Sequence, residues 1–156
     1  MDGFRITTVR YADDSQIAIT GPRKSLSEMQ CALEKVLNIA NAWFLQNGMM
    51  VNAAKTELLL WGDRRQLVQI SKPAEVWFKG ECLKSSNQVK NLGIIMDSTL
   101  TWNKHVRMIT NRCFGIPVGL SHARHSPPVR IIPRLIDCLV ISQLRFCVQV
   151  YGNGHH

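Results

Sequence analysis

The sequence predicts an α+β fold with a sheet-and-helix part over about residues 1–100 and a helical part over residues 101–156. Three observations support this prediction. Short segments rich in β-branched and aromatic residues alternate with turn residues in the first part. One long segment among them has apolar residues at helical spacing. After Asp97 two helix-like segments follow, joined by the polar connector Ser121–Ser126, which predicts that the second part is helical.

A hairpin is predicted near the N-terminus. Phe4–Arg10 and Ile17–Thr20 are rich in β-branched residues and are predicted strands. The stretch between them, residues 11–16, is short enough to form a hairpin turn. Gly21 and Pro22 end the second strand, because both residues interrupt regular structure.

A helix is predicted over Ser25–Asn47. Ser25 and Glu28 have the spacing of a capping box at its start, and Gly48 stands where a helix C-cap is expected. Its apolar residues form one face suited to cover a sheet: Leu26, Met29, Leu33, Val36, Leu37, Ala40, Trp43 and Phe44.

Further strands are predicted between this helix and residue 100. Glu57–Trp61 has the apolar character of a buried strand, and residues 63–65 are a polar loop. Val76–Phe78 and Cys82–Leu83 flank Lys79-Gly80-Glu81 and are predicted to form a hairpin. Val89–Met96 is predicted to be a single strand that ends at Asp97.

Two helices are predicted after residue 100. The first begins near Trp102 and ends at Gly115 and Pro117. Lys104 and Arg107 lie opposite its apolar face and are predicted to contact nucleic acid. The inward stripe of this helix is predicted to be Trp102, Val106, Ile109 and Cys113. The second helix, Ile131–Leu144, is apolar enough to be buried, with Pro133 tolerated in its first turn.

Composition narrows the classes of partner. The formal net charge of +8 favours a polyanion such as nucleic acid, although an indifferent basic surface is an equal alternative. The chain has no run of 18 apolar residues and no signal peptide, so no membrane partner is expected. Five cysteines without a Cys-x-x-Cys pair favour reduced thiols and an intracellular protein, in the cytoplasm and nucleus.

The adjacent carboxylates Asp13 and Asp14 indicate a metal site. Two like charges side by side resist joint ionisation unless a cation neutralises them. Mg²⁺ suits one or two carboxylates together with water and substrate phosphates, and Mn²⁺ is a possible substitute. Such a site performs two-metal phosphoryl or nucleotidyl transfer. Taken alone, however, the Asp pair is more often a turn-forming sequence than a metal site.

The surroundings of this pair carry a family resemblance. Tyr11-Ala12-Asp13-Asp14 between two apolar strands resembles the metal-binding hairpin of reverse transcriptases. Ser25–Asn47 followed by Asn52-Ala53-Ala54-Lys55-Thr56-Glu57 resembles the next palm helix and its Asn-x-x-Lys-Thr-Glu stretch. Val89–Val106 resembles the segment that joins palm to thumb, and Leu139–Tyr151 the end of the thumb helices. Together they resemble LINE-type (non-LTR) retrotransposon reverse transcriptases over essentially the whole chain.

The resemblance implies a fold, a reaction and roles for particular residues. Residues 1–100 would be a partial polymerase palm, an antiparallel sheet with flanking helices, and residues 101–156 a helical thumb. The reaction would be RNA-directed DNA synthesis with Mg²⁺ on an RNA template and a DNA primer, from deoxynucleoside triphosphates. The implied metal ligands are Asp13 and Asp14, and Lys55 would act on the pyrophosphate leaving group. Tyr11, Leu92 and Gly93 would contact nucleic acid, with Leu92-Gly93 in a strand that steadies the primer end.

One departure from the family shapes the functional expectation. The family's third aspartate, its nucleotide-binding segment and its fingers precede the Tyr-Ala-Asp-Asp turn, whereas only Asp2 precedes Asp13 here. We therefore expect a missing upstream polymerase segment and an inactive isolated chain. The alternatives are a non-catalytic nucleic-acid-binding remnant of a retroelement and a metal-dependent nuclease built on Asp13 and Asp14.

Overall fold

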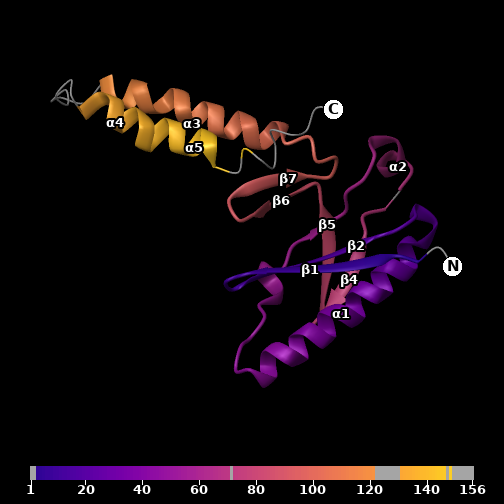
Figure 1. Cartoon of the computed structure of the whole chain (residues 1–156). Helices are drawn as coiled ribbons and strands as arrows, with labels where there is room; N and C mark the ends of the chain where they lie inside the picture. Colours follow the sequence, from indigo (N-terminus) through magenta and orange to yellow (C-terminus); the bar gives the residue numbers. More distant parts are fainter. Residues whose placement is uncertain (1–2, 71, 122–130, 147, 149–156) are drawn as a thin grey trace. The chain divides into compact units, whose positions relative to one another are not determined.

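The computed structural model of the chain is mixed α+β and describes residues 3–70, 72–121, 131–146 and 148 (Figure 1). Its contacts group into two compact units, Met1–Asn87 and Gln88–His156. The second unit therefore contains a hairpin as well as helices. The assignment of residues 1–100 to a palm and 101–156 to a thumb stays a prediction.

The predicted N-terminal hairpin is present. β1 (Arg5–Tyr11) and β2 (Asp14–Thr20) pair antiparallel in a register that runs from Arg5↔Thr20 to Tyr11↔Asp14. The turn is only Ala12 and Asp13, because the strands extend into the stretch predicted as loop. β1 is exposed along its whole length, whereas the middle of β2 is half-buried beside the first long helix.

That helix, α1 (Leu26–Gln46), confirms the predicted helix Ser25–Asn47 along its length and at its C-terminal end. Gly48 has a φ of +72°, and the amides of Gly48 and Met49 donate to the carbonyls of Leu45 and Phe44, which is a Schellman motif. The predicted capping box is wrong. A short 3₁₀ turn, η1 (Arg23–Ser25), precedes α1 and gives Ser25 a near-helical backbone, so its side chain makes no capping hydrogen bond.

A three-stranded sheet in the order β3-β5-β4 completes the first unit. β4 (Glu75–Phe78) and β5 (Glu81–Ser86) form the predicted hairpin. β3 (Leu58–Leu59) pairs with β5 in parallel, so the expectation of a wholly antiparallel sheet is wrong. The short helix α2 (Arg64–Val68) lies in the connection from β3 to β4 and begins within residues 63–65, which were predicted as loop. β4 then runs opposite to β3, and β5 runs in the direction of β3 again.

α1 packs on β4 (Figure 1). Val76 and Phe78 of β4 are buried, with exposed fractions of 1% and 2%. Polar side chains of α1 also bond the free edge of β4: the Gln30 amide donates to the Glu75 carbonyl at 3.1 Å, and Glu34 accepts the Trp77 N–H at 2.8 Å. These bonds satisfy backbone groups that an edge strand otherwise leaves open.

In the second unit, the predicted single strand Val89–Met96 is wrong. It is a hairpin of β6 (Gln88–Asn91) and β7 (Ile94–Asp97). Leu92 and Gly93 have φ values of 45° and 87°, which a two-residue turn between twisted strands requires. Leu92 and Gly93 therefore lie in a turn and not within a strand.

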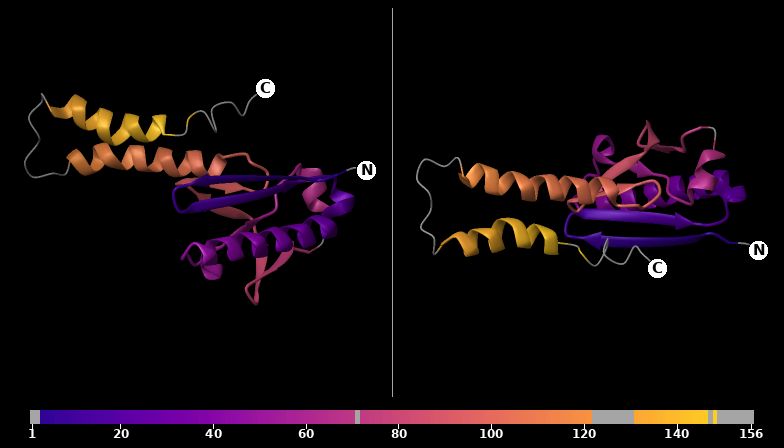
Figure 2. Two further views of the ribbon diagram at one scale, coloured as in Figure 1. Left: turned by 60° about the horizontal axis from the view of Figure 1, so that its bottom comes forward. Right: turned by 90° about the horizontal axis from the view of Figure 1, so that it is seen from above.

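The helices of the second unit lie side by side, α3 (Asn103–Ser121) against a continuous helical run of α4 (Ile132–Ile136), η4 (Asp137–Ile141) and α5 (Ser142–Arg145) (Figure 2). The predicted end of the first helix at Gly115 and Pro117 is wrong, because α3 continues through both residues. α3 packs on η4 and α5 along this run.

The second helical run is confirmed, and Pro133 lies in its first turn. Its predicted burial is wrong: Ile136 and Leu144 are 42% and 43% exposed. The helices form a single pair, and a helix with one neighbour leaves part of its apolar surface open. Within Leu139–Tyr151, the segment compared with the thumb's end, residues 147 and 149–151 lie outside the described residues.

The inward face of α3 differs from the prediction at one position. Ile109 is buried and Trp102 and Cys113 are half-buried, as expected, but Val106 is 44% exposed. His105 takes its place with an exposed fraction of 1%. Its Nδ1 accepts the N–H of Ile95 at 3.3 Å, an interaction that an apolar side chain cannot make.

We predict that the stability of the second unit depends on His105 and on pH. Burial, and secondarily the charge of Arg112, lower the pKa of His105 below its usual 6.5. The unfolded chain therefore binds more protons, so this contribution is complete above about pH 6.5 and is lost as the pH falls below it. Urea unfolding between pH 5 and 8 should show this loss.

The matched control is His105→Asn, which keeps an acceptor near the Nδ1 position and removes the titration. The stability of this variant should depend less on pH in the same range. An equal pH dependence in both proteins would assign the effect to other groups.

Candidate metal-binding turn and nucleic-acid surface

The hairpin tip presents two carboxylates from a constrained turn. Ala12 has a φ of 52°, a left-handed conformation that costs an Ala residue about 1–2 kcal/mol. The seven residue pairs of β1 and β2 hold it there. Asp13 lies in the turn and Asp14 opens β2, and both side chains are exposed. The predicted hairpin around the aspartate pair is confirmed, with Asp13 in its turn and Asp14 at the start of β2, whereas the convergence of the two side chains on a metal stays a prediction.

Tyr11 stands beside this acidic pair. It faces Asp14 across the ladder, so both side chains leave the hairpin on the same side. Tyr11 is 66% exposed. An aromatic ring in this place is accessible to a base or sugar, but its contact with nucleic acid stays a prediction.

The donor set of the turn fits Mg²⁺ in part. Carboxylate oxygens are the ligands that Mg²⁺ takes from proteins, and water and phosphate usually complete its shell. Within the described ranges, no group of three or more His, Cys, Asp or Glu residues is arranged to hold a metal. Asp13 and Asp14 could therefore supply one side of a metal site, with the remaining ligands from solvent, substrate or another polypeptide.

Arg10, beside the tip of the β1–β2 hairpin, contacts α1, and sequence analysis did not predict this contact. Its guanidinium lies over the rings of Trp43 and Phe44, at 4.6 and 5.6 Å from their centroids. The two rings meet edge to face, with centroids 5.3 Å apart. Such cation–π contacts stabilise by about 0.5–2 kcal/mol, and this one holds the residue just before the Tyr-Ala-Asp-Asp turn.

Lys55 belongs to the same unit as the turn. It is the last residue of the 3₁₀ turn η2 (Ala53–Lys55). The Thr56 hydroxyl after this turn donates to the carbonyl of Asn52 before it, at 2.9 Å. Ala53 is buried and anchors this turn, while Lys55 is exposed. The geometry leaves its amine accessible, and its role at a leaving group stays a prediction.

The remaining predicted site residues belong to the second unit. Leu92 is 40% exposed at the tip of the β6–β7 hairpin. A Cβ at Gly93 would lie 3.5 Å from the Phe146 ring, an ordinary van der Waals distance, so the left-handed φ and not crowding favours glycine here. Contact of these two residues with nucleic acid stays a prediction.

The outer face of α3 carries the predicted basic residues. Lys104, Arg107 and Asn111 are exposed, and the Lys104 amine donates to Gln88 Oε1 at 2.6 Å. Phe114 lies on the same helical face and is 73% exposed. Sequence analysis missed Phe114, although its position seven residues after Arg107 indicates the shared face. Basic and aromatic side chains on one surface are typical of nucleic-acid binding.

A hydrogen-bonded carboxylate also joins β7 to α3. Asp97 Oδ1 accepts from Thr99 N at 3.0 Å, Thr99 Oγ1 at 2.8 Å and Thr101 N at 3.1 Å. Its Oδ2 accepts from Thr101 Oγ1 at 3.0 Å and Trp102 N at 3.1 Å. Partial burial raises the pKa of Asp97, but the hydrogen bonds from Thr99 and Thr101 together outweigh burial and lower the pKa below its usual 3.8. Sequence analysis placed only a strand end here.

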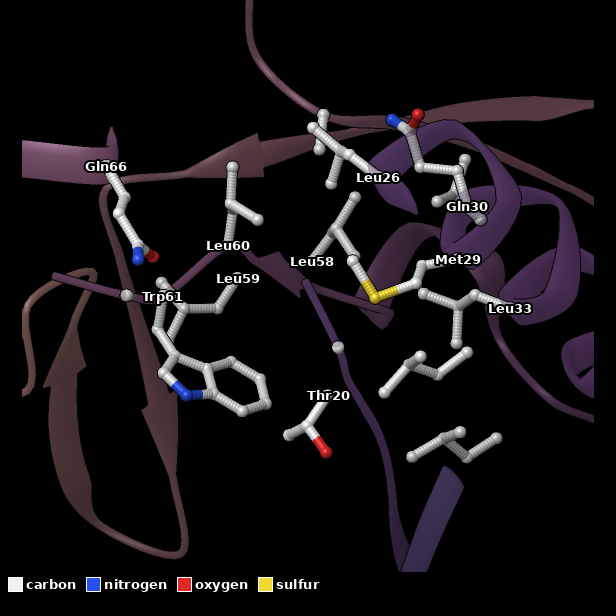
Figure 3. A pocket seen from close by; sticks show the side chains of 16 residues that line it. Thr20, Leu26, Met29, Gln30, Leu33, Leu58, Leu59, Leu60, Trp61 and Gln66 are labelled. Atoms are coloured by element: carbon white, nitrogen blue, oxygen red, sulfur yellow. The ribbon is translucent and has the colours of Figure 1, made fainter. Parts of the chain in front are cut away.

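The first unit also contains an apolar pocket of about 290 Å³ between α1, β2 and β3 (Figure 3). Met29, Leu58 and Leu60 point into it, and Trp61 and Thr20 lie at one side. Its lining contains no charged side chain. Without a carboxylate to hold a metal ion or a basic side chain to bind phosphate, this pocket does not fit a metal or a nucleotide phosphate.

The cysteines and the helices can be compared with the predictions of reduced thiols and of no membrane partner. Cys31, Cys82, Cys113 and Cys138 are free thiols, and Cys147 lies outside the described residues. Across the described ranges, each helix is too short or too polar to span a lipid bilayer.

Comparison with known proteins gives two relatives. The chain is 25% identical over 146 residues to the RNA-directed DNA polymerase from mobile element jockey of Drosophila funebris, an alignment that covers 91% of this chain and 15% of that protein. It is 31% identical over 104 residues to the probable RNA-directed DNA polymerase from transposon BS of Drosophila melanogaster, which covers 67% of this chain and 11% of that protein.

The chain thus spans less than a sixth of the length of either relative. No family model matches it, and no solved structure matches it significantly. The resemblance inferred from the motifs is nevertheless confirmed: the chain is a sequence relative of the RNA-directed DNA polymerases of LINE-type mobile elements.

Proposed function

We propose that the chain is part of the palm and thumb of a retrotransposon reverse transcriptase, an RNA-directed DNA polymerase. The observation that carries the proposal is the constrained Asp13–Asp14 turn within a Tyr-Ala-Asp-Asp motif, in a chain related to such polymerases. The partners would be an RNA template, a DNA primer and deoxynucleoside triphosphates.

In this reaction Asp13 and Asp14 hold Mg²⁺ at the hairpin tip. The bound ions would activate the primer hydroxyl and stabilise the leaving oxygen. Lys55 neutralises or protonates the pyrophosphate leaving group, for which its exposed amine is suited. Tyr11, beside Asp14, contacts the incoming nucleotide or the primer end.

The second unit binds the primer–template duplex. Lys104 and Arg107 contact phosphates from the outer face of α3, and Leu92 and Gly93 contribute the tip of the β6–β7 hairpin. Phosphate contacts supply most of the sequence-independent affinity of such proteins.

A second candidate function follows from the donor set. The described residues bring together only two carboxylates at the turn, which is an incomplete ligand set for two metals. A non-catalytic retroelement remnant that binds nucleic acid through α3 would need no metal site. The experiments below separate the two functions.

We predict that Asp13 and Asp14 bind Mn²⁺ weakly and together. NMR signals of residues 11–16 should broaden first as Mn²⁺ is added, and Asp13→Asn with Asp14→Asn should remove this selective broadening. Asp63→Asn is the matched control in the same unit, because Asp63 is an exposed carboxylate that caps α2. Broadening spread evenly over all acidic residues would contradict the metal site.

We predict that Lys104 and Arg107 contribute to nucleic-acid affinity through phosphates. For a fluorescein-labelled DNA duplex, the slope of log K against log salt should flatten by about 0.9 for each lost contact. Lys104→Ala with Arg107→Ala should flatten it by about two. Arg64→Ala with Arg65→Ala removes the same charge from the exposed surface of α2 and should change the slope less. Equal effects of both double variants would indicate a delocalised charge effect.

We predict that the 156-residue chain alone does not extend a primer on an RNA template with Mg²⁺. The turn supplies ligands from one side only, and substrate positioning alone lowers a barrier by about 7–11 kcal/mol. A polypeptide with the family's preceding aspartate strand and fingers, added in trans, should restore some product. Restoration that survives Asp13→Ala would contradict the role assigned to Asp13. Extension by the chain alone that Asp13→Ala abolishes would agree with that role but contradict the predicted inactivity of the chain alone.

A further inference from the structure

We propose that Asp97 is a positioning residue for nucleic-acid binding: its carboxylate fixes α3 on the β6–β7 hairpin and thereby sets the direction of the basic face of α3. This inference rests on the proposed nucleic-acid contact of Lys104 and Arg107. It adds a residue that touches no nucleic acid itself but determines where the contacting residues stand.

The first support is the completeness of the hydrogen bonding. Both Asp97 oxygens accept hydrogen bonds, from three backbone amides and two hydroxyls of Thr99, Thr101 and Trp102. Hydrogen bonds to a charged acceptor are shorter and stronger than those between neutral groups. The whole connector between β7 and α3 is therefore organised around one side chain at the end of β7.

The second support is the backbone of this connector. Leu100 and Trp102 have φ values of 51° and 60°, so two bulky non-glycine residues within three positions are left-handed. Such conformations persist only where the surroundings determine them strongly. The amide of Thr101, between the two left-handed residues, and the amide of Trp102 itself both donate to Asp97. The carboxylate thus holds a reversal that the chain would not adopt alone.

The third support is what the connector aligns. Immediately after it, His105 accepts the Ile95 N–H and Lys104 bonds Gln88, so the first turn of α3 contacts both strands of the hairpin. Lys104 and Arg107 lie on the opposite side of this turn from the buried His105 and Ile109. The direction of these basic side chains is therefore tied to the path of the connector.

For the neutralisation of Asp97, charge and positioning predict opposite changes in nucleic-acid affinity. A carboxylate near a phosphate-binding surface repels a polyanion, so neutralising it should tighten binding. Positioning predicts weaker binding, because Asn at this position cannot accept all five hydrogen bonds and its amide group meets donors. The sign of the change separates the two explanations.

The experiment compares Asp97→Asn with Asp63→Asn, which makes the same charge change at the N-cap of α2, where Asp63 accepts the Arg65 N–H. The probe is a fluorescein-labelled DNA duplex titrated between about 50 and 200 mM salt. Asp97→Asn should bind about fivefold or more weakly, with a slope flatter by about one. Asp63→Asn should bind as wild type or more tightly. Equal or tighter binding by Asp97→Asn would overturn the proposal.

Amide hydrogen exchange provides a readout without nucleic acid. The amides of Thr99, Thr101 and Trp102 should exchange about tenfold faster in Asp97→Asn, whereas the α1 amides should not change. Unchanged amide exchange in the connector would contradict the proposal that Asp97 fixes it, even if DNA binding weakened. If wild type shows no salt-dependent DNA binding, the proposed function fails, and the exchange result still decides whether Asp97 holds the connector.

A second variant covers the case in which Asp97→Asn does not fold by circular dichroism. Thr99→Val with Thr101→Val keeps the carboxylate and its backbone bonds and removes the two hydroxyl donors. It should show a smaller loss of affinity in the same direction, with faster exchange at Trp102. Wild-type affinity and exchange in this variant would contradict the positioning role.

Discussion

The hairpins of this chain depend on one backbone constraint: a two-residue turn between right-twisted strands requires left-handed φ values. Ala12, Lys79 and Leu92 meet this requirement with φ values of 52°, 52° and 45°, although none of them is glycine. A left-handed non-glycine residue costs about 1–2 kcal/mol, which the strand pairing outweighs. The same constraint determines the candidate site, because it places Asp13 and Asp14 at the hairpin tip, where both side chains are exposed.

Few apolar side chains are buried, so polar side chains fix much of the backbone. The buried hydrophobic residues among those described are Ala53, Ala74, Val76, Phe78, Ile94 and Ile109. In the first unit, Gln30 and Glu34 bond the open edge of β4. In the second, Asp97 and His105 bond the backbone around the start of α3. These directional bonds give specific geometry with little core, and they also make the second unit sensitive to protonation of His105.

Two exposed charged surfaces of the chain, one acidic and one basic, are each suited to phosphate in a different way. The exposed carboxylates Asp13 and Asp14 can approach a phosphate only through a cation, whereas Lys104 and Arg107 can contact phosphate directly. The net charge of +8 favours the same polyanion for both. Arg10 is a cation near the acidic tip, and its stacking on Trp43 holds its guanidinium over an aromatic ring. A polymerase needs both surfaces, but a binding remnant needs only the second.

Local sequence was enough to predict the β1–β2 turn with its two aspartates, the length of α1 to Gly48, the basic face of α3 and the family resemblance, because each depends on neighbouring residues or on helical spacing. It was not enough at Leu92–Gly93, where apolar residues on both sides imitate one strand. Nor could it show that His105 faces inward in place of Val106, or that Asp97 organises a connector. The inward position of His105 depends on the Ile95 N–H of β7, a partner from another element. The partners of Asp97 are near in sequence, but they meet it only because Leu100 and Trp102 adopt left-handed φ values, which persist only where the folded surroundings determine them.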